Sequence, residues 1–396
     1  MRASEPLAER KRSGMNAKEI VLIGGGHAHA LALKALADRD RERFSVTLVS
    51  PSRWQHYSGM VPGWMTGQYE LEACQMDLRQ IADHAGARFV EDWAVGLDAT
   101  RGCVFLSDGS HLPFDALSLD VGAEVDSTWL TALHDKLLPV KPMADFARLW
   151  QSLLARADLP SAFKLAIVGG GAAGVEVSLA AAVGLRKAQV TTTMVLITGR
   201  RGLLPDHPPG VRQQVGRALS RANVQVVAQQ AVGTEGGVML DDGLELPLDA
   251  VIAATGSRAP VWLSLTKLDL DEQGFVSVNA CHQSTSHPNV FAAGDVCSRT
   301  DRAITRSGVH AVRAGPILAH NLVAWLQGRP MKEHEPRRWP LQLISTGPTH
   351  AVASWGPIST SGNWVWRLKD QIDRRFMRSL IVRDRLPNRP TEGQTP

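Results

Sequence analysis

Cysteine is scarce in this sequence, and the four residues present are far apart: Cys74, Cys103, Cys281 and Cys297. No two of them form a CxxC or CxxxxC pair. A redox-active dithiol and a cysteine-ligated zinc site both require such spacing, so the sequence predicts neither of them and no metal site. A few scattered thiols are typical of a protein that works in the reducing cytoplasm.

Long apolar runs, a signal sequence and a strong net charge are also missing. No stretch approaches 18 consecutive apolar residues, so no transmembrane helix is predicted. Residues 1–17 are polar and charged and lack the apolar core of a signal peptide, so we expect a disordered tail. The net charge is only +4 and no nucleic-acid-binding motif is visible, so no nucleic-acid partner is predicted. The 396 residues are enough for two or three globular domains.

A glycine-rich turn follows the first short apolar run. Residues 24–29 read Gly-Gly-Gly-His-Ala-His, and a helical pattern begins directly after them. A strand, a glycine turn and a helix predict a dinucleotide site, because Gly24 permits the tight turn and Gly26 lets backbone N–H groups approach a pyrophosphate. His29 replaces the third glycine of the motif, and Ser50 ends the next strand where a ribose-binding acid is usual. A glycine turn that holds no ligand is the alternative interpretation.

The second glycine-rich turn keeps the full GxGxxG spacing at Gly169, Gly171 and Gly174, between an apolar run and an alanine-rich helix. Its context makes it the stronger dinucleotide motif. The following strand ends in Arg200 and Arg201 rather than in an acid. Arginines can pair with a ribose 2′-phosphate, which favours NADPH or the use of both nicotinamide cofactors. A solvated surface pair is the alternative role of these arginines.

The sequence also contains an internal repeat. Residues 106–122 combine an Asp-Gly pair, a Leu-Pro-x-Asp-Ala segment and a final Gly122, and residues 240–256 repeat this pattern and end at Gly256. An Asp-Gly pair between β-type runs predicts a hairpin, and the apolar run after it predicts a strand that returns to the parent sheet. Each block lies behind a glycine turn, so we infer two copies of one nucleotide-binding unit.

A further strand end lies outside both copies. The apolar run at residues 289–292 stops before Gly294 and Asp295, and a helix is expected to start near Gly308. We expect this strand to return the chain to the first sheet. The Asp295 carboxylate then lies at a strand's carboxyl end, where the sugar-phosphate part of a cofactor is usually found.

Together, these motifs resemble the two-dinucleotide-binding flavoproteins of the pyridine nucleotide–disulfide oxidoreductase superfamily. The sequence is most similar to the type II NADH dehydrogenase-like branch, and within it to a subgroup whose members are sometimes fused to selenide, water dikinase. Five segments carry the resemblance: residues 24–29, 57–63, 308–316, 353–357 and 373–377. The similar region spans residues 18–380.

The resemblance implies an α/β fold with two Rossmann-like domains, a discontinuous one for FAD and one for NAD(P)H, and a small C-terminal region. We expect the FAD domain at residues 18–140 and 276–335, the NAD(P)H domain at residues 141–275 and the C-terminal region at residues 336–396. Hydride then passes from NAD(P)H to FAD, and a quinone or similar acceptor takes the electrons. Catalysis in such a site is mostly positioning, so no acid–base dyad is required.

The same resemblance assigns roles to single residues. Lys141, in the crossover between the domains, is expected to face the cofactor, and Glu176 to lie between nicotinamide and flavin, which makes both candidate catalytic residues. An acid favoured by the dipole of the helix N-terminus is the alternative role of Glu176. The candidate cofactor ligands are Gly24, Gly25, Gly26, His27, Ala28, His29, Gly122, Lys141, Gly169, Gly171, Gly174, Glu176, Arg200, Gly256, Gly294, Asp295, Arg306, Ser307, Gly308 and Val309. His27 and His29 contact phosphate or flavin, or alternatively serve packing.

Residues 364–380 have the pattern of an amphipathic basic helix, and a quinone enzyme must contact a membrane. Apolar residues recur at helical spacing at Val365, Leu368, Ile372, Phe376 and Leu380. Cations and interfacial tryptophans lie among them: Arg367, Lys369, Arg374, Arg375, Arg378, Trp364 and Trp366. We expect a cytoplasmic protein held on the membrane surface by this helix. Docking of the helix on its own domain, or on the second subunit of a homodimer, is the alternative.

Two other functions stay open. The fusion partner of the similar proteins suggests a flavoprotein of sulfur or selenium chemistry, for which Cys297 is the candidate thiol, with simple packing as its alternative role. The missing ribose acids after both glycine turns leave open a nucleotide-binding sensor with low turnover.

Overall fold

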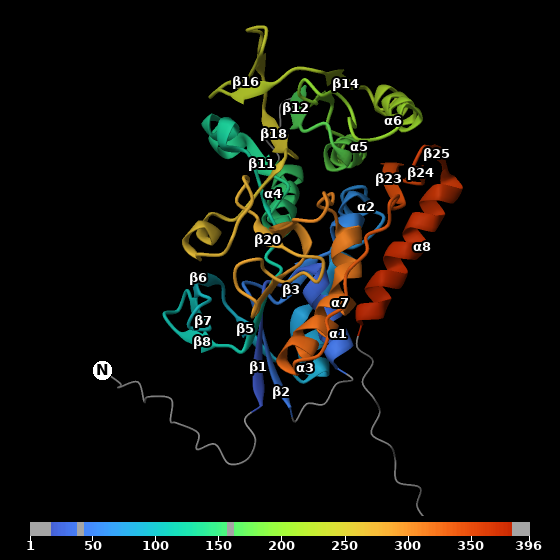
Figure 1. Ribbon diagram of the computed structural model, residues 1–396. Coiled ribbons are helices and arrows are strands. Elements are labelled where there is room, and N and C mark those ends of the chain that lie inside the picture. Colours follow the sequence, from blue (N-terminus) through green and yellow to red (C-terminus); the bar gives the residue numbers. More distant parts are fainter. Residues whose placement is uncertain (1–16, 38–42, 157–161, 382–396) are drawn as a thin grey trace, which may run out of the picture.

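The computed structural model describes residues 17–37, 43–156 and 162–381, and its main features are two parallel sheets of similar construction (Figure 1). Residues 1–16 of the expected tail lie outside this part of the chain. The first sheet has the strand order β21-β9-β1-β2-β5, with all neighbours parallel. Its strands are β1 (Lys18–Ile23), β2 (Phe44–Ser50), β5 (Arg88–Glu91), β9 (Ala116–Leu119) and β21 (Val290–Ala292). Because β21 comes from the far end of the chain, the predicted return strand and the discontinuous first domain are confirmed.

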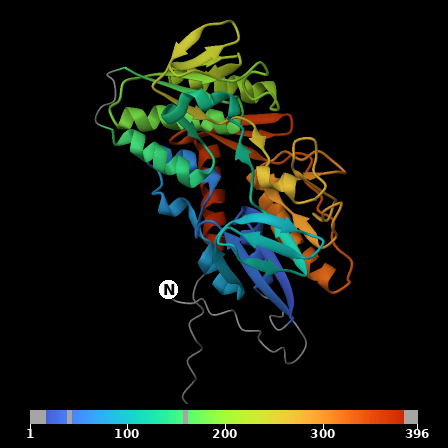
Figure 2. The ribbon, with the colours of Figure 1, turned by 90° about the vertical axis from the view of Figure 1, so that its left-hand side faces the viewer.

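Both faces of the first sheet are covered, which explains its continuous apolar strands. Ile20 and Leu22 of β1 face the helices, whereas Val21 and Ile23 face an antiparallel sheet on the other side. The helices are α1 (His27–Leu36), α3 (Leu78–Ala85) and α7 (Gly308–Leu326). The antiparallel sheet consists of β6 (Ala94–Asp98), β7 (Cys103–Leu106) and β8 (His111–Pro113). Figure 2 shows it lying in front of the first sheet.

The second sheet repeats this plan with the strand order β11-β18-β12-β13-β14. Its strands are β11 (Leu137–Pro139), β12 (Phe163–Val168), β13 (Thr192–Ile197), β14 (Val224–Val227) and β18 (Ala250–Ala253). The helices α4 (Met143–Leu154), α5 (Ala172–Lys187) and α6 (Pro209–Arg221) accompany it, together with the antiparallel strands β15 (Ala231–Gly233), β16 (Gly237–Leu240) and β17 (Glu245–Pro247). Both predicted Asp-Gly hairpins and both returning strands are present, so the internal repeat is confirmed. Strand β11 pairs with β18 although it precedes residue 141, so the second sheet begins before the expected boundary.

Short elements connect the two units. Strand β10 (Glu124–Val125) pairs with β19 (Ser257–Arg258), and the Glu124 and Arg258 side chains form an ion pair of 2.8 Å. The remaining strands are β3 (Trp54–His56), β4 (Gln75–Asp77), β20 (Val276–Val278) and β22 (Cys297–Arg299). The remaining helices are α2 (Val61–Met65) and the 3₁₀ segments η1 (Ser58–Met60), η2 (Glu72–Cys74), η3 (Thr128–Lys136), η4 (Val261–Leu265) and η5 (Gly294–Val296).

The C-terminal region adds one small sheet and one long helix. Strands β23 (Gln342–Gly347), β24 (His350–Trp355) and β25 (Ile358–Gly362) are antiparallel, and α8 (Asn363–Leu380) follows them directly. Strand β23 packs on α5 of the second unit, and α8 then runs down one side of the molecule towards the first unit (Figure 1). Within the described residues, no helix is both long enough and apolar enough to cross a bilayer.

Candidate functional site

The first glycine turn brings β1, α1 and β9 into close contact. Gly24 has a φ of +97°, which glycine adopts without steric cost, and a Cβ there would lie 2.4 Å from the Asp120 carbonyl oxygen. A Cβ at Gly26 would lie 2.2 Å from the Asp120 carboxyl carbon. The neighbouring Gly25 serves packing instead, because a Cβ there would meet the Leu78 side chain at 2.1 Å.

Asp120 is a buried residue that follows β9 and contacts the start of α1, and it was not predicted as a site residue. Its carboxylate accepts a hydrogen bond from the His29 backbone N–H at 3.0 Å. Burial and, to a smaller extent, the charge of Asp295 raise the pKa of this carboxyl to about 7. The internal repeat could have indicated this residue, because it aligns Asp120 of the first copy with the apolar Ala254 of the second.

His29 stands at the position of the third glycine, and two hydrogen bonds hold its ring in place. In the second turn a Cβ at Gly174 would lie 1.8 Å from the Gly169 carbonyl oxygen, so only glycine permits that approach. In the first turn His29 Nδ1 lies 2.7 Å from the Gly24 carbonyl oxygen, and Nε2 lies 2.8 Å from Ser118 Oγ. Both ring nitrogens are engaged within the fully buried core, so the predicted contact of the His29 side chain with a cofactor is wrong.

The structure brings Lys141 and Asp295 together, although 154 residues separate them in the sequence. Lys141 Nζ donates to Asp295 Oδ2 at 2.8 Å. His27, the first residue of α1, lies close enough for both charges to act on its imidazole, while burial lowers its pKa to about 4. Its buried Nε2 has no hydrogen-bond partner within the described part of the chain. A neutral imidazole and an ion pair therefore face the start of α1.

The second turn leaves its helix end free for a ligand. The N-cap of α5 is Gly171, and within the described residues no side chain caps this helix and no acid lies in its first turn. A Cβ at Gly171 would meet nothing within 4 Å among these residues, and the same holds at Gly122, Gly256 and Gly308. These predicted cofactor glycines thus border open space. An uncapped helix N-terminus attracts phosphate groups through its N–H groups and its dipole.

Arg200 lies at the expected strand end but already has a partner. Its Nε donates to Asp241 Oδ2 at 2.8 Å, while its side chain stays 72% exposed. The neighbouring Arg201 pairs in the same way with Asp206. These contacts favour the solvated surface pair that the sequence left as the alternative to a 2′-phosphate site.

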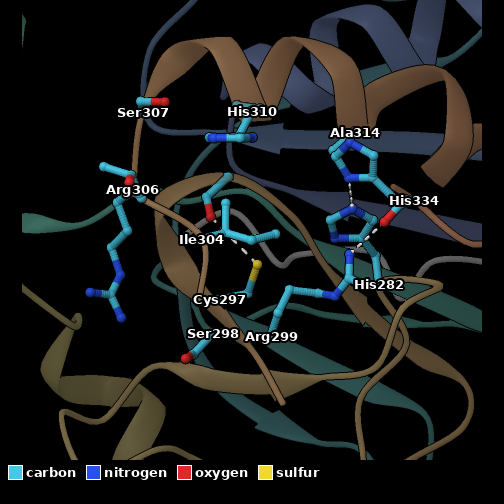
Figure 3. Close-up of a pocket in the computed structure, with 13 residues that line it drawn as sticks. His282, Cys297, Ser298, Arg299, Ile304, Arg306, Ser307, His310, Ala314 and His334 are labelled. Carbon is cyan, nitrogen blue, oxygen red and sulfur yellow. Dashed lines mark hydrogen bonds between the residues drawn. The ribbon is translucent and has the colours of Figure 1, made fainter. Parts of the chain in front are cut away.

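A pocket lies beside the N-terminus of α7 (Figure 3), and Gly294 is one of the residues that line it. Ser307 is the N-cap of α7, and Gly308 begins the helix. The Arg306 guanidinium stacks on the Phe275 ring at 3.4 Å from its centroid, and its buried Nε has no partner among the described residues. Val309 is 36% exposed at the same helix end. This group combines open space with positive charge and free N–H donors.

The far wall of the pocket is a structural cluster. His282 Nε2 and His334 Nδ1 lie 2.8 Å apart, and Arg299 donates to the His334 carbonyl oxygen (Figure 3). Cys297 lies beside this cluster, with its Sγ 3.4 Å from the Gly294 carbonyl oxygen. Burial raises the pKa of the Cys297 thiol to about 12, so the thiol stays protonated and is a poor nucleophile at neutral pH.

Glu176 lies between the second unit and the C-terminal region. Its Oε1 accepts from the Ser345 backbone N–H at 2.7 Å. Burial raises the Glu176 pKa, while the Lys369 charge lowers it. Lys369 in turn pairs with Asp373 at 2.6 Å, and Tyr57 Oη donates to the other oxygen of Asp373 at 2.9 Å. Tyr57, Lys369 and Asp373 were not predicted as site residues, although Tyr57 and Asp373 belong to segments that carry the family resemblance.

Helix α8 docks on its own chain through the face that was expected to meet a membrane. Val365 and Leu380 are buried and Phe376 is partly buried, whereas Ile372 is 42% exposed. Lys369, predicted to belong to the basic surface, is only 8% exposed because it points inward. The expectation that this apolar face inserts into a bilayer is therefore wrong, and the docked alternative describes it.

The residues present fit two dinucleotides. Helices α1, α5 and α7 begin at Gly26, Gly171 and Ser307 without a side-chain cap in the described part of the chain, so each N-terminus keeps N–H donors for an anion. Open space borders four of the predicted glycines. Asp120 is compatible with a nearby phosphate in its protonated form, which a pKa of about 7 makes accessible.

Comparison with known proteins identifies the family pattern. The family model described as pyridine nucleotide-disulphide oxidoreductase matches residues 18–320. Demethylphylloquinone reductase NdbB of Synechocystis is 28% identical over 317 residues, which cover 74% of this chain and 77% of that protein.

Two solved structures share the fold. The sulfide:quinone oxidoreductase of Aquifex aeolicus superposes with a TM-score of 0.77 at 16% identity, over 92% of this chain and 91% of that one. NDH2 of Plasmodium falciparum in complex with NADH gives a TM-score of 0.75 at 14% identity, over 92% of this chain and 98% of that one.

Proposed function

Because this chain belongs to the pyridine nucleotide-disulphide oxidoreductase family, it is an FAD-dependent oxidoreductase of NAD(P)H, and we propose that its electron acceptor is a quinone. The observation that carries this proposal is the meeting of both glycine-turn units and the C-terminal region around Tyr57, Glu176 and Asp373. No cysteine pair is available to pass the electrons to a disulfide. The related NdbB is named as a quinone reductase, which supports the same acceptor class.

The first turn, Asp295 and Lys141 are proposed to hold FAD, and the second turn with Glu176 to hold NAD(P)H. Bound flavin supplies the chemistry of accepting a hydride and releasing two electrons. The protein itself contributes positioning. The N-termini of α1 and α5 hold the phosphates, and the Lys141–Asp295 ion pair holds an ammonium and a carboxylate group beside His27. The free N–H groups at the start of α7 are suited to stabilise negative charge.

Sulfur or selenium chemistry is the competing function, and Cys297 does not support it. A cysteine that acts as a nucleophile in such chemistry must be accessible as thiolate, whereas burial raises the pKa of Cys297 to about 12. We therefore expect Cys297→Ser to reduce NAD(P)H oxidation by less than twofold, about 0.4 kcal/mol of activation free energy.

The test is anaerobic flavin reduction followed by reoxidation. We expect NADH or NADPH to bleach the flavin absorbance and a soluble benzoquinone to restore it within one mixing experiment. A protein that purifies without flavin, or whose flavin is bleached by sulfide or selenide and not by nicotinamides, would contradict the proposal. If NAD(P)H bleaches the flavin but no quinone reoxidises it, the proposed acceptor is wrong. Only the transfer of hydride from NAD(P)H to FAD then remains.

Membrane contact is proposed through the outer face of α8, since its inner face is docked. Trp364 is 57% exposed there, and Arg367, Arg375 and Arg378 are exposed on the same side. Such a face attracts anionic lipid headgroups on the cytoplasmic leaflet. We expect flotation with phosphatidylglycerol vesicles and its loss in the variant R375E/R378E. The matched control, R217E/R221E on α6, should still float.

An outcome in which both variants and the original chain ignore vesicles would refute this contact. A concentration-dependent increase in mass that R375E/R378E abolishes would instead assign the outer face of α8 to a homodimer.

A further inference from the structure

A tyrosine lies where the two glycine-turn units approach each other. The Tyr57 ring contacts the ring of His27, at the start of α1, edge-on with a centroid distance of 5.4 Å. It also contacts Phe376 of α8 at 4.7 Å. From the second unit, the Glu176 carboxylate acts on the Tyr57 hydroxyl through its charge. Tyr57 thus touches the FAD side directly and lies within electrostatic range of the NAD(P)H side.

The Tyr57 hydroxyl is the end of a hydrogen-bonded chain that starts in α8. Tyr57 Oη donates to Asp373 Oδ1 at 2.9 Å. Lys369 Nζ donates to Asp373 Oδ2 and to the Gly59 carbonyl oxygen, both at 2.6 Å. Lys369 and Asp373 are 8% and 5% exposed, and α8 carries them one turn apart on its inner face. The chain Lys369–Asp373–Tyr57 therefore leads from the docked helix to the ring of His27.

Stability alone explains this arrangement poorly. Removing a lysine and an aspartate from water costs about as much as their attraction returns, and apolar side chains of similar size usually pack as well. Apolar side chains of α8, among them Met377 and Leu380, also pack on the first unit, and the Phe376 ring contacts the Tyr57 ring. An ion pair aimed at a single tyrosine hydroxyl is what a proton donor needs, because it orients the hydroxyl and supplies a second proton behind it.

We propose that Tyr57 gives a proton to the electron acceptor and that Asp373 and Lys369 orient and reload it. This inference rests on the proposed function, because a quinone that takes up a hydride becomes a hydroquinone anion and still needs one proton. The Tyr57 O–H bond breaks, its electron pair stays on the tyrosine oxygen, and a new O–H bond forms on the acceptor. A proton passed from Lys369 through Asp373 neutralises the tyrosinate, and solvent recharges Lys369.

The surroundings of Tyr57 keep this proton in place until it is needed. Burial raises the Tyr57 pKa, and the charges of Asp373 and Glu176 raise it further, so the hydroxyl is protonated throughout the neutral range. Lys369 is the cation that faces this group from α8, and His27 faces it from α1 with a pKa lowered to about 4, which leaves the imidazole neutral. The proton therefore leaves only together with its replacement from Lys369 through Asp373, so that no tyrosinate builds up beside the acceptor oxygen.

Two oxidants separate proton delivery from electron transfer. The NAD(P)H-reduced holoenzyme is mixed with a soluble benzoquinone, which takes up protons, or with ferricyanide, which takes up electrons alone. Tyr57→Phe should lower the ratio of the quinone rate to the ferricyanide rate by ~100-fold, the usual size of a general-acid contribution. The matched control is Tyr69→Phe, because Tyr69 Oη also donates to a carboxylate of α8, Asp370, at 2.5 Å. In Tyr69→Phe, the ratio of the quinone rate to the ferricyanide rate should equal that of the original enzyme.

A second readout needs no turnover. The chain has only two tyrosines, so ¹³Cζ-tyrosine labelling gives two signals that the two phenylalanine variants assign. At neutral pH, Asp373→Asn should shift the Tyr57 signal, because the carboxylate that accepts the hydrogen bond of this hydroxyl is removed, while the Tyr69 signal stays in place.

Three results would overturn the inference. These are an unchanged rate ratio in Tyr57→Phe, an equal loss with both oxidants, or a Tyr57 signal that Asp373→Asn leaves unmoved at neutral pH. If the original enzyme reduces ferricyanide but no quinone, the proposed function fails and the role of Tyr57 fails with it. If the original enzyme reduces quinone and one of the three results above is found, only the role of Tyr57 fails.

Discussion

Asp120 is the residue whose environment departs most from what its type prefers. Its carboxyl is buried against Gly26 and Gly294, and its pKa of about 7 lies above the ordinary value of 3.8. A raised pKa means that the folded protein binds the proton more tightly, so this contribution to stability is complete below pH 4 and is lost as the pH rises to 7. Between pH 5.5 and 7 we expect a loss of about 2 kcal/mol, at 1.36 kcal/mol per unit.

Asp120→Asn should remove this slope, since an amide does not ionise in this range. The measurement is the free energy of unfolding in urea at pH 5.5 and 7 for both proteins. Asp108→Asn, in an exposed hairpin turn, is the control and should keep the original slope. Equal slopes in the original chain and Asp120→Asn would show that the carboxyl is not held in its neutral form.

The sequence predicts single residues well where backbone geometry dictates them and poorly where distant side chains meet. Gly24 and Gly174 follow from a turn that tolerates only glycine. The pairing of Lys141 with Asp295 was reachable only because the family resemblance assigned both to one cofactor. Tyr57 and Asp373 lie 316 residues apart, and no local pattern relates them.

At the scale of elements, the closest approach is that of α1 to α7. A Cβ at Gly315 would lie 2.6 Å from the Ala28 carbonyl oxygen and 2.8 Å from Leu31 Cβ. Gly315→Ala gains helix propensity of about 1 kcal/mol but forces α7 away from α1, at an overpacking cost of about 1–3 kcal/mol. Because the glycine turn begins α1, we expect lower stability together with weaker FAD retention, measured by thermal unfolding and by flavin absorbance after gel filtration.

The control for this change is Gly216→Ala in α6, where the nearest atom to a new Cβ is 4.0 Å away. That variant should be neutral or more stable by up to about 1 kcal/mol, because only propensity changes. If both substitutions shift the melting temperature alike, the contact between α1 and α7 does not limit the structure.

The elements themselves were largely predictable, because strand, turn and helix each have a local signal. The two five-stranded sheets, the hairpins and the return strand β21 follow from apolar runs, glycines and the internal repeat. The period of residues 364–380 correctly indicated an amphipathic helix. It did not indicate what the apolar face meets, because a membrane and a protein core select the same pattern. Lys369 shows this limit, since a lysine within a basic helix reads as surface until its partner Asp373 is seen.

For the whole molecule, the C-terminal region joins the two glycine-turn units. Strand β23 packs on α5, where Ser345 binds Glu176, whereas α8 binds the first unit through Tyr57 and the Gly59 carbonyl oxygen. Without this bridge the two units are held by the short β10–β19 pair, by the packing of α2 on α5 and by the chain crossings. Deleting residues 336–396 should therefore replace one cooperative thermal transition by two, seen by calorimetry of the FAD-loaded protein.

The order of the two transitions is also expected. The second unit buries its sheet in one large cluster, and it loses the contacts of β23, β24 and β25 with α5 and α6, among them those of Ile344 and Val352. The first unit loses Met377 and Leu380 from its helix-side core and leaves Tyr57 without its carboxylate partner. The melting temperature of the first unit should therefore fall by more than that of the second. An excess of FAD should raise it again, because ligand binding stabilises only the unit that binds it. A single transition at the original temperature would mean that the two units are coupled without the C-terminal region.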